Sequence, residues 1–170
     1  LLSYDFFNDN RLPLKGSYIG LIYDDIPSGS WSYHSCDSTW QAPTILKSGD
    51  YKALYIPIVK EKWVAFSIKI PEPGNYDASL YHAKISTGST SGEVYLLPAN
   101  ISVESAVSDP AGTYRIGGTV NYRSSSLITG NKNAVQLGSV YIEQPGEYIL
   151  VFHSGKTGSS NYIAPSRFVL

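Results

Sequence analysis

The feature that most constrains this chain is a motif that occurs twice. The first copy spans Val64–Leu80 and the second spans Gly138–Phe152, with Gly74 matching Gly146, 72 positions later. In each copy a Pro-Gly pair follows a stretch in which apolar residues alternate with small or polar ones, the pattern of a strand with one buried face. Proline presets φ at a corner and glycine accepts a positive φ. Each copy therefore predicts a strand, a tight turn and a second strand.

The alternation also predicts the side chains of a shared core. Tyr76 and Tyr148 follow equivalent turns, so we expect them at equivalent inward positions. The two turn glycines, Gly74 and Gly146, are expected to adopt backbone conformations that other residues resist. The same core is predicted to include Phe66, Ile68, Val140, Leu150 and Phe152.

Short strands are predicted along most of the remaining chain. Asn100–Gly112 is the least clear stretch, and no segment longer than a few residues has the i, i+3, i+4, i+7 apolar spacing of a helix. The predicted fold class is all-β, an antiparallel two-sheet β-sandwich. Jelly-roll topology fits best, because its two halves place similar hairpins in opposite sheets. The predicted strands are Ser3–Phe7, Ser17–Tyr23, Tyr51–Val59, Trp63–Ile70, Tyr76–Ile85, Glu93–Pro98, Thr113–Arg123 with a bulge at Gly117-Gly118, and Arg167–Leu170. The second copy of the motif fills Val135–Lys156.

The composition limits the partners of the chain. Its net charge is −1 and its basic residues are scattered, so nucleic acid and anionic membranes are not expected to bind. Membrane insertion is not expected either, because no apolar run approaches the roughly 20 residues of a spanning segment. The 170 residues are predicted to form a single domain. Because the chain contains no methionine, we expect a module excised from a larger protein, with neighbouring domains of the same chain as partners.

A candidate ligand site lies in the stretch Asp24–Asp50, which is rich in Ser, Gly, Pro and Asp. Long irregular loops in compact domains are usually functional or disordered, and the two tryptophans in this one argue against disorder. Aromatic rings stack on the C–H face of a sugar while short polar side chains bind its hydroxyls. The alternative is that these rings cap the open end of the sandwich as core. The candidate residues are Trp31, Tyr33, His34, Asp37 and Trp40.

Two further sites are weighed outside that cluster of aromatics. Tyr122 and Arg123, next to the predicted loop Ser124–Asn133, form a second candidate ligand-binding position. Four aspartates are also candidates for a calcium site, because calcium prefers carboxylate and carbonyl oxygens as ligands. The alternative is that these aspartates are ordinary carboxylates in turns, exposed to solvent. The candidate calcium ligands are Asp5, Asp9, Asp24 and Asp25.

Catalytic signals are sparse. The sequence has no Gly-x-Ser-x-Gly nucleophile motif, and no spacing singles out a pair of carboxylates for glycoside hydrolysis. The three histidines, His34, His82 and His153, lie in no metal-ligand spacing, so a zinc site needs them to converge through folding. We therefore expect a protein that is not an enzyme.

Three segments give the chain a resemblance to a known family. Pro73-Gly-Asn-Tyr76, Gly92-Glu-Val-Tyr95 and Pro145-Gly-Glu-Tyr148 with the strand that follows resemble the galactose-binding-like β-sandwiches. Members of that group serve as carbohydrate-binding modules in secreted multimodular bacterial proteins, often with a structural calcium ion near the N-terminal strand. The resemblance implies a polysaccharide or glycan as partner and an extracellular or cell-surface location.

The leading hypothesis is thus a non-catalytic carbohydrate-binding module of an extracellular or cell-surface protein. A structural spacer or protein-interaction domain of a surface protein, built on the same sandwich without a sugar site, is the alternative. A small enzyme is a third hypothesis. Fold alone does not separate them.

Overall fold

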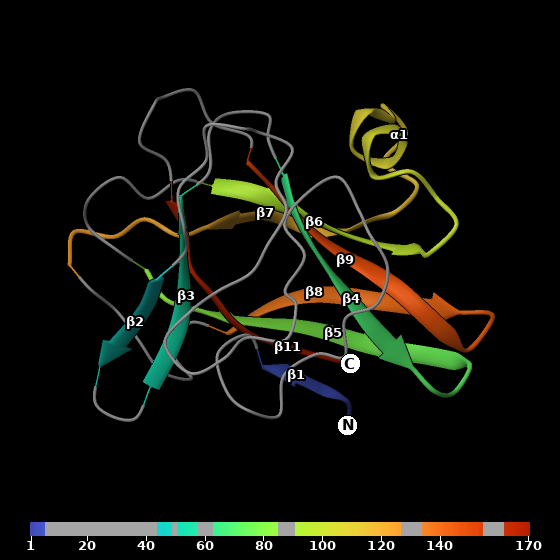
Figure 1. The fold of residues 1–170 in the computed structure, drawn as a ribbon, viewed down its shortest axis with the longest axis horizontal. Coiled ribbons are helices and arrows are strands. Elements are labelled where there is room, and N and C mark those ends of the chain that lie inside the picture. Colours follow the sequence, from blue (N-terminus) through green and yellow to red (C-terminus); the bar gives the residue numbers. More distant parts are fainter. Residues whose placement is uncertain (6–43, 49–50, 58–62, 85–90, 127–133, 155–161) are drawn as a thin grey trace.

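The protein is an all-β sandwich in a computed structural model that describes residues 1–5, 44–48, 51–57, 63–84, 91–126, 134–154 and 162–170 (Figure 1). Two four-stranded antiparallel sheets form its layers. The elements, in chain order, are β1 (Ser3–Asp5), β2 (Thr44–Ser48), β3 (Tyr51–Pro57), β4 (Trp63–Ile70), β5 (Gly74–His82), β6 (Ser91–Pro98), α1 (Val103–Ser108), β7 (Arg115–Asn121), β8 (Ala134–Ile142), β9 (Gly146–Ser154), β10 (Tyr162–Ile163) and β11 (Pro165–Val169).

Each layer is named here after a central strand. The β5 sheet has the strand order β1-β11-β5-β8, and the β9 sheet has the order β4-β9-β6-β7. A smaller three-stranded sheet has the order β10-β3-β2. The all-β sandwich predicted from the sequence is therefore confirmed, while the jelly-roll connectivity stays a prediction.

The two Pro-Gly turns join strands of different sheets. The first turn leads from β4 in the β9 sheet to β5 in the β5 sheet, and the second leads from β8 back to β9. Each copy is the predicted strand, turn and strand, and its two strands belong to different sheets. A turn between sheets lets the apolar faces of both strands in one copy point into the space between the layers, which buries both faces without pairing the two strands.

The two motif copies pair with each other around an internal twofold axis. Strand β4 pairs with β9 and β5 pairs with β8, so that Ile70 lies opposite Gly146 and Gly74 lies opposite Ile142. Both turn glycines have φ of 139°, which confirms the expected special conformation. The two copies of the 72-residue repeat therefore pair with each other, the first strand of each copy with the second strand of the other.

The main core fills the gap between the two sheets. Phe66 and Phe152 face each other there edge to face, with ring centroids 5.8 Å apart. The predicted inward residues Ile68, Leu150 and Tyr148 are also buried in this core. Tyr76 and Val140 are only partly buried and pack against it, which agrees with their predicted side of the strand.

Strand β4 is buried on both faces, although its alternation predicted one. Ala65 and Ser67 are buried on the side away from the main core, and Lys69 is exposed. The hydroxyl of Ser67 donates to the carboxylate of Glu147, which satisfies the buried polar group. A second apolar cluster, with Trp63, covers this outer face and includes Val103 and Ala106 of α1.

The helix α1 lies in Asn100–Gly112, the stretch with the least clear prediction. Its six residues are too few to show helical periodicity in the sequence. The hydroxyl of Ser102 accepts a hydrogen bond from the N–H of Ser105 and caps the first turn. In Figure 1 the helix stands over one end of the β9 sheet.

Two other sequence predictions differ in outcome. The bulge at Gly117-Gly118 is confirmed, because the register between β6 and β7 shifts there and Gly117 has φ of 70°. Within the predicted loop Asp24–Asp50, residues Thr44–Ser48 form β2, so that part of the loop prediction is wrong. The predicted strand Ser17–Tyr23 lies outside the described residues.

Candidate functional site

An open cleft of about 440 Å³ lies between the edges of the two sheets. Strand β7 of the β9 sheet forms one wall and the end of β8 in the β5 sheet forms the other. This volume falls in the range of small-ligand pockets, about 300–1,000 Å³. The described residues that line it are Leu96, Pro98, Thr113, Tyr114, Arg115, Ile116, Ser139, Val140, Tyr141, Ile142, Glu143 and Tyr148.

The two edge strands approach each other closely at Gly117, and the cleft lies beside this point. At the point of contact a Cβ on Gly117 would lie 2.8 Å from the Cα of Leu137, closer than real side chains approach a backbone. Glycine alone permits this approach. Next to it, Gly138 has φ of 99° at the shift in register between β5 and β8. The two bulged strands leave the cleft open on the side of Arg115 and Tyr141.

The floor of the cleft is apolar and buried. Leu96, Ile116 and Ile142 are buried in the main core beneath it. The hydroxyl of Tyr148 donates to the carbonyl of Gln144 at 2.7 Å, which holds the ring in place. A ligand in the cleft would therefore meet a preformed surface.

The rim carries one exposed aromatic ring and several polar groups. The side chain of Tyr141 is 68% exposed. Among the described residues, the only other large hydrophobic side chain that is exposed is that of the N-terminal Leu1. Arg115 extends from the opposite wall, with its guanidinium 3.5 Å from the hydroxyl of Thr119. Thr113 donates its hydroxyl to Asp109 at 2.8 Å, and hydrogen bonds from Thr113 and Ala111 lower the pKa of that carboxyl.

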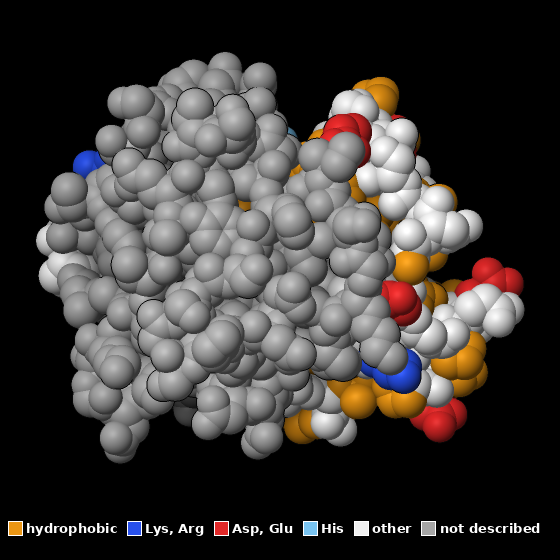
Figure 2. All heavy atoms as spheres, viewed as in Figure 1, with side chains coloured by type: hydrophobic (Ala, Val, Ile, Leu, Met, Phe, Trp, Pro, Cys, Tyr) orange, Lys and Arg blue, Asp and Glu red, His pale blue; other side chains and the backbone are white. Residues whose placement is uncertain are grey.

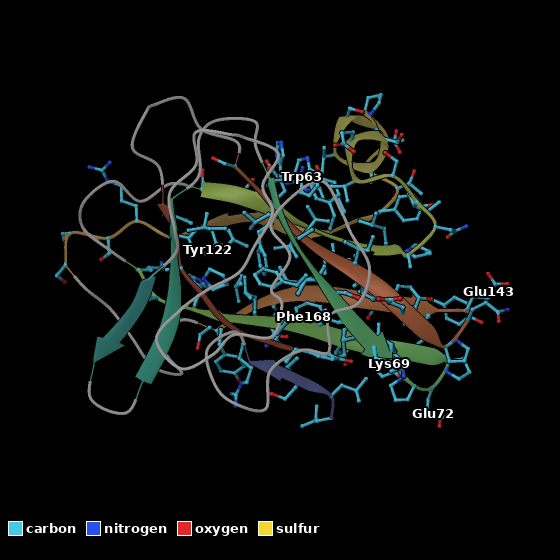
Figure 3. The ribbon with its side chains drawn as sticks, viewed as in Figure 1. Trp63, Lys69, Glu72, Tyr122, Glu143 and Phe168 are labelled. Atoms are coloured by element: carbon cyan, nitrogen blue, oxygen red, sulfur yellow. The ribbon has the colours of Figure 1, made fainter. Side chains whose placement is uncertain are left out.

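Glu143 completes the rim at the turn after β8. It is exposed, and within the described part of the chain it has neither a hydrogen bond nor an ion pair. Figure 3 shows it at the end of β8, on the same end of the molecule as Glu72. Figure 2 shows apolar and acidic side chains side by side on that end. The rim therefore offers a ring, a guanidinium, a hydroxyl and a free carboxylate to one ligand.

Neither of the two described sequence-predicted ligand residues, Tyr122 and Arg123, is among the lining of this cleft. Trp31, Tyr33, His34, Asp37 and Trp40 lie outside the described residues.

Tyr122 is 2% exposed, and its ring packs edge to face on His82 with centroids 5.0 Å apart. Burial raises the pKa of its phenol, with a smaller contribution from the charge of Glu93. The ring therefore belongs to the core of the sandwich. Arg123 faces solvent, and its backbone N–H donates to the side chain of Asn121 at 2.9 Å.

Of the four predicted calcium ligands, only Asp5 lies within the described residues. Asp9, Asp24 and Asp25 lie outside them, and Asp5 is paired with Arg167 in the strand ladder. Calcium binding stays a prediction. Among the residues that the structure describes, no group of three His, Cys, Asp or Glu side chains could hold a metal ion.

The two described histidines have other partners. The Nδ1 atom of His82 lies 3.0 Å from the carbonyl of Ala83, and that of His153 lies 3.2 Å from the carboxylate of Glu93. Desolvation lowers the pKa of His82.

Over the described part of the chain, no helix is long and apolar enough to cross a membrane.

Sequence reasoning missed the cleft residues Tyr141, Glu143 and Arg115. One signal for Tyr141 was present, because a large aromatic stands there at an outward position of the second motif copy, where the first copy has Lys69. Nothing local in the sequence shows that β7 approaches β8, since these strands do not pair.

Comparisons with known proteins bear on the fold. No protein-family profile and no curated protein sequence matches the chain. Among solved structures, it is similar to part of a Paenibacillus xanthan lyase, with a TM-score of 0.50, 15% identity, and 81% of this chain and 12% of the lyase covered. The chain thus spans only 12% of that enzyme, and the likeness supports the fold alone.

Two further solved structures are similar at lower TM-scores. A β-1,3-glucan-binding CBM6 from Bacillus halodurans has a TM-score of 0.39 and 17% identity, with 77% of this chain and 89% of that chain covered. A cycloisomaltooligosaccharide glucanotransferase from Paenibacillus sp. has a TM-score of 0.41 and 12% identity, with 78% of this chain and 17% of that chain covered.

Proposed function

We propose that this protein is a non-catalytic carbohydrate-binding domain and that the cleft between β7 and β8 is its binding site. The observation that carries the proposal is the Tyr141 ring, 68% exposed at the rim of an open cleft of about 440 Å³. The ring stands beside an apolar floor and a few polar side chains, which is the usual composition of a small-ligand site. The fold, which is similar to part of a protein named as a xanthan lyase, is compatible with this role.

The chemistry of the rim suits a sugar. The faces of sugar rings carry C–H groups that pack on a phenol ring, and their hydroxyls both donate and accept hydrogen bonds. Ser139, Arg115 and Glu143 supply the matching polar groups around Tyr141. Ser139 already donates to Asp77 and Arg115 to Thr119, and both side chains keep further hydrogen-bonding capacity for a ligand.

The number of carboxylate side chains in the cleft favours binding over hydrolysis. The described lining of the cleft contains one carboxylate, that of Glu143. Glycoside hydrolysis generally uses a pair of carboxyl groups about 5–10 Å apart. We further propose that the domain belongs to an extracellular or cell-surface protein with additional domains, where polysaccharides are accessible.

The test is affinity electrophoresis of the isolated chain through gels that contain a panel of polysaccharides, followed by calorimetry with oligosaccharides of any that retard it. One ring and a few hydrogen bonds give a weak site, with Kd on the order of 10 µM to 1 mM. Tyr141→Ala should weaken binding at least tenfold and leave the thermal unfolding midpoint nearly unchanged.

Tyr81 provides a matched control. It is a partly exposed tyrosine on the neighbouring strand β5, outside the cleft, with the Arg167 guanidinium 4.3 Å from its ring centroid. Tyr81→Ala should leave binding unchanged. Loss of binding in Tyr81→Ala but not in Tyr141→Ala would move the site away from the cleft. Silence across the whole panel would contradict the proposed function and favour the spacer or protein-interaction alternative.

A further inference from the structure

The internal twofold gives the cleft a counterpart in the other half of the molecule. The β5 sheet ends in β1 as the β9 sheet ends in β7, and β1 contacts β4 through the side chain of Tyr4. In that counterpart, Tyr4 of β1 is 8% exposed and donates its hydroxyl to the carbonyl of Lys69 in β4. Its ring lies against Phe168, with centroids 6.3 Å apart. One side chain therefore occupies the place that is open between β7 and β8.

The two halves also differ at the positions that line the cleft. Tyr141 stands where the first half has Lys69, and Glu143 stands where it has Pro71. The shared framework needs neither side chain, because the first half forms the same strand and turn without them. Tyr141 and Glu143 are thus features of the open cleft rather than of the repeated scaffold.

The charges at the cleft are balanced across its two walls. Arg115 on β7 presents N–H donors and no acceptor, whereas the carboxylate of Glu143 presents acceptors only. The neutral group that satisfies both is a hydroxyl, since it donates and accepts. A carboxylated ligand suits Arg115 but places like charges together at Glu143.

From this arrangement we propose that the ligand is a neutral glycan, with hydroxyls that donate to Glu143 and accept from Arg115 while one sugar ring stacks on Tyr141. Glycans rich in uronic acids are disfavoured. The inference rests on the proposed function and names the class of carbohydrate that the same site takes. Glu143 is then a specificity-determining residue, because it penalises acidic ligands while binding neutral ones.

The experiment compares oligosaccharides of equal length from neutral and uronic-acid polysaccharides, by calorimetry at low and high salt. Binding of the neutral ligand should be at least tenfold tighter and nearly independent of salt, because no ion pair forms. Glu143→Gln should weaken the neutral ligand about fivefold to tenfold and reduce the discrimination against the acidic one. Glu72→Gln is the matched control, because Glu72 is an exposed glutamate on the equivalent turn of the other half (Figure 3).

The outcomes separate this inference from the proposed function. Tighter binding of the acidic ligand, dependent on Tyr141 and steeply weakened by salt, would overturn the inference and leave carbohydrate binding intact. Equal effects of Glu143→Gln and Glu72→Gln would also overturn it. Absence of binding to either class would instead contradict the proposed function. Tyr141→Lys, which installs the residue of the equivalent β4 position, should abolish binding of the neutral ligand without unfolding the chain.

Discussion

Gly117 of β7 lies directly against the backbone of Leu137 in β8, where the edges of the two sheets meet. The φ of 70° at Gly117 is in the left-handed region that residues with a side chain rarely adopt. This contact joins two strands that share no ladder, and it sets the closed end of the cleft.

The first prediction concerns that contact. Gly117→Ala should lower the free energy of unfolding by about 1–3 kcal/mol, from backbone strain and from the clash with Leu137. Chemical denaturation measures the change. Gly118→Ala is the control, because a Cβ there meets nothing within 4 Å, and it should be nearly neutral. Equal stability of the two variants would show that the close approach does not exist.

The second prediction concerns the main core. Phe152 is 1% exposed and faces Phe66, so Phe152→Ala should cost about 3–5 kcal/mol by removing apolar contacts and leaving a cavity. Phe152→Leu should cost clearly less. Urea unfolding curves provide the measurement, and a loss below about 1 kcal/mol for the alanine variant would contradict this position for the ring.

The third prediction uses the two equivalent tyrosines. Tyr76 donates to the carbonyl of Glu72 and Tyr148 to that of Gln144, each at 2.7 Å. Replacing Tyr148 with Phe should destabilise the chain by about 1 kcal/mol. Tyr76→Phe should cost less, because its bond is exposed and water replaces the phenol. The same denaturation assay compares the two, and a larger loss at Tyr76 is the contrary result.

The fourth prediction concerns pH. Desolvation lowers the pKa of buried His82 below its ordinary value of 6.5, with Lys84 adding to the effect and the hydrogen bond to Ala83 opposing it. Below pH 6.5 the unfolded chain binds a proton that the folded chain resists, so stability should fall as the pH drops from about 6.5 toward the folded pKa. Stability measured from pH 8 to 5 should show this slope, and His82→Gln should flatten it. An unchanged slope would assign the titration to other groups.

The sequence alone determined the local elements around the motif. Alternation in Val64–Ile70 and the Pro-Gly pairs specify strands and turns through side-chain period and backbone dihedrals, which depend on near neighbours only. The prediction for β4 matches its bounds, Trp63–Ile70, for this reason. The inward positions of Phe66 and Phe152 follow from the same period. The bulge at Gly117-Gly118 was equally local.

Tertiary structure alone decided which strands meet. A Pro-Gly turn can join two strands of one sheet or lead from one sheet to the other. Which of these forms depends on how much apolar surface the two motif copies bury against each other, and that burial involves residues far apart in the sequence. The burial of Tyr122 has the same cause, because this residue, just after β7, lies where His82 packs against its ring. The cleft is the feature that the sequence could predict least. Arg115 and Tyr141 lie on unpaired edges of different sheets, and only the contact of Gly117 with Leu137 brings those edges together.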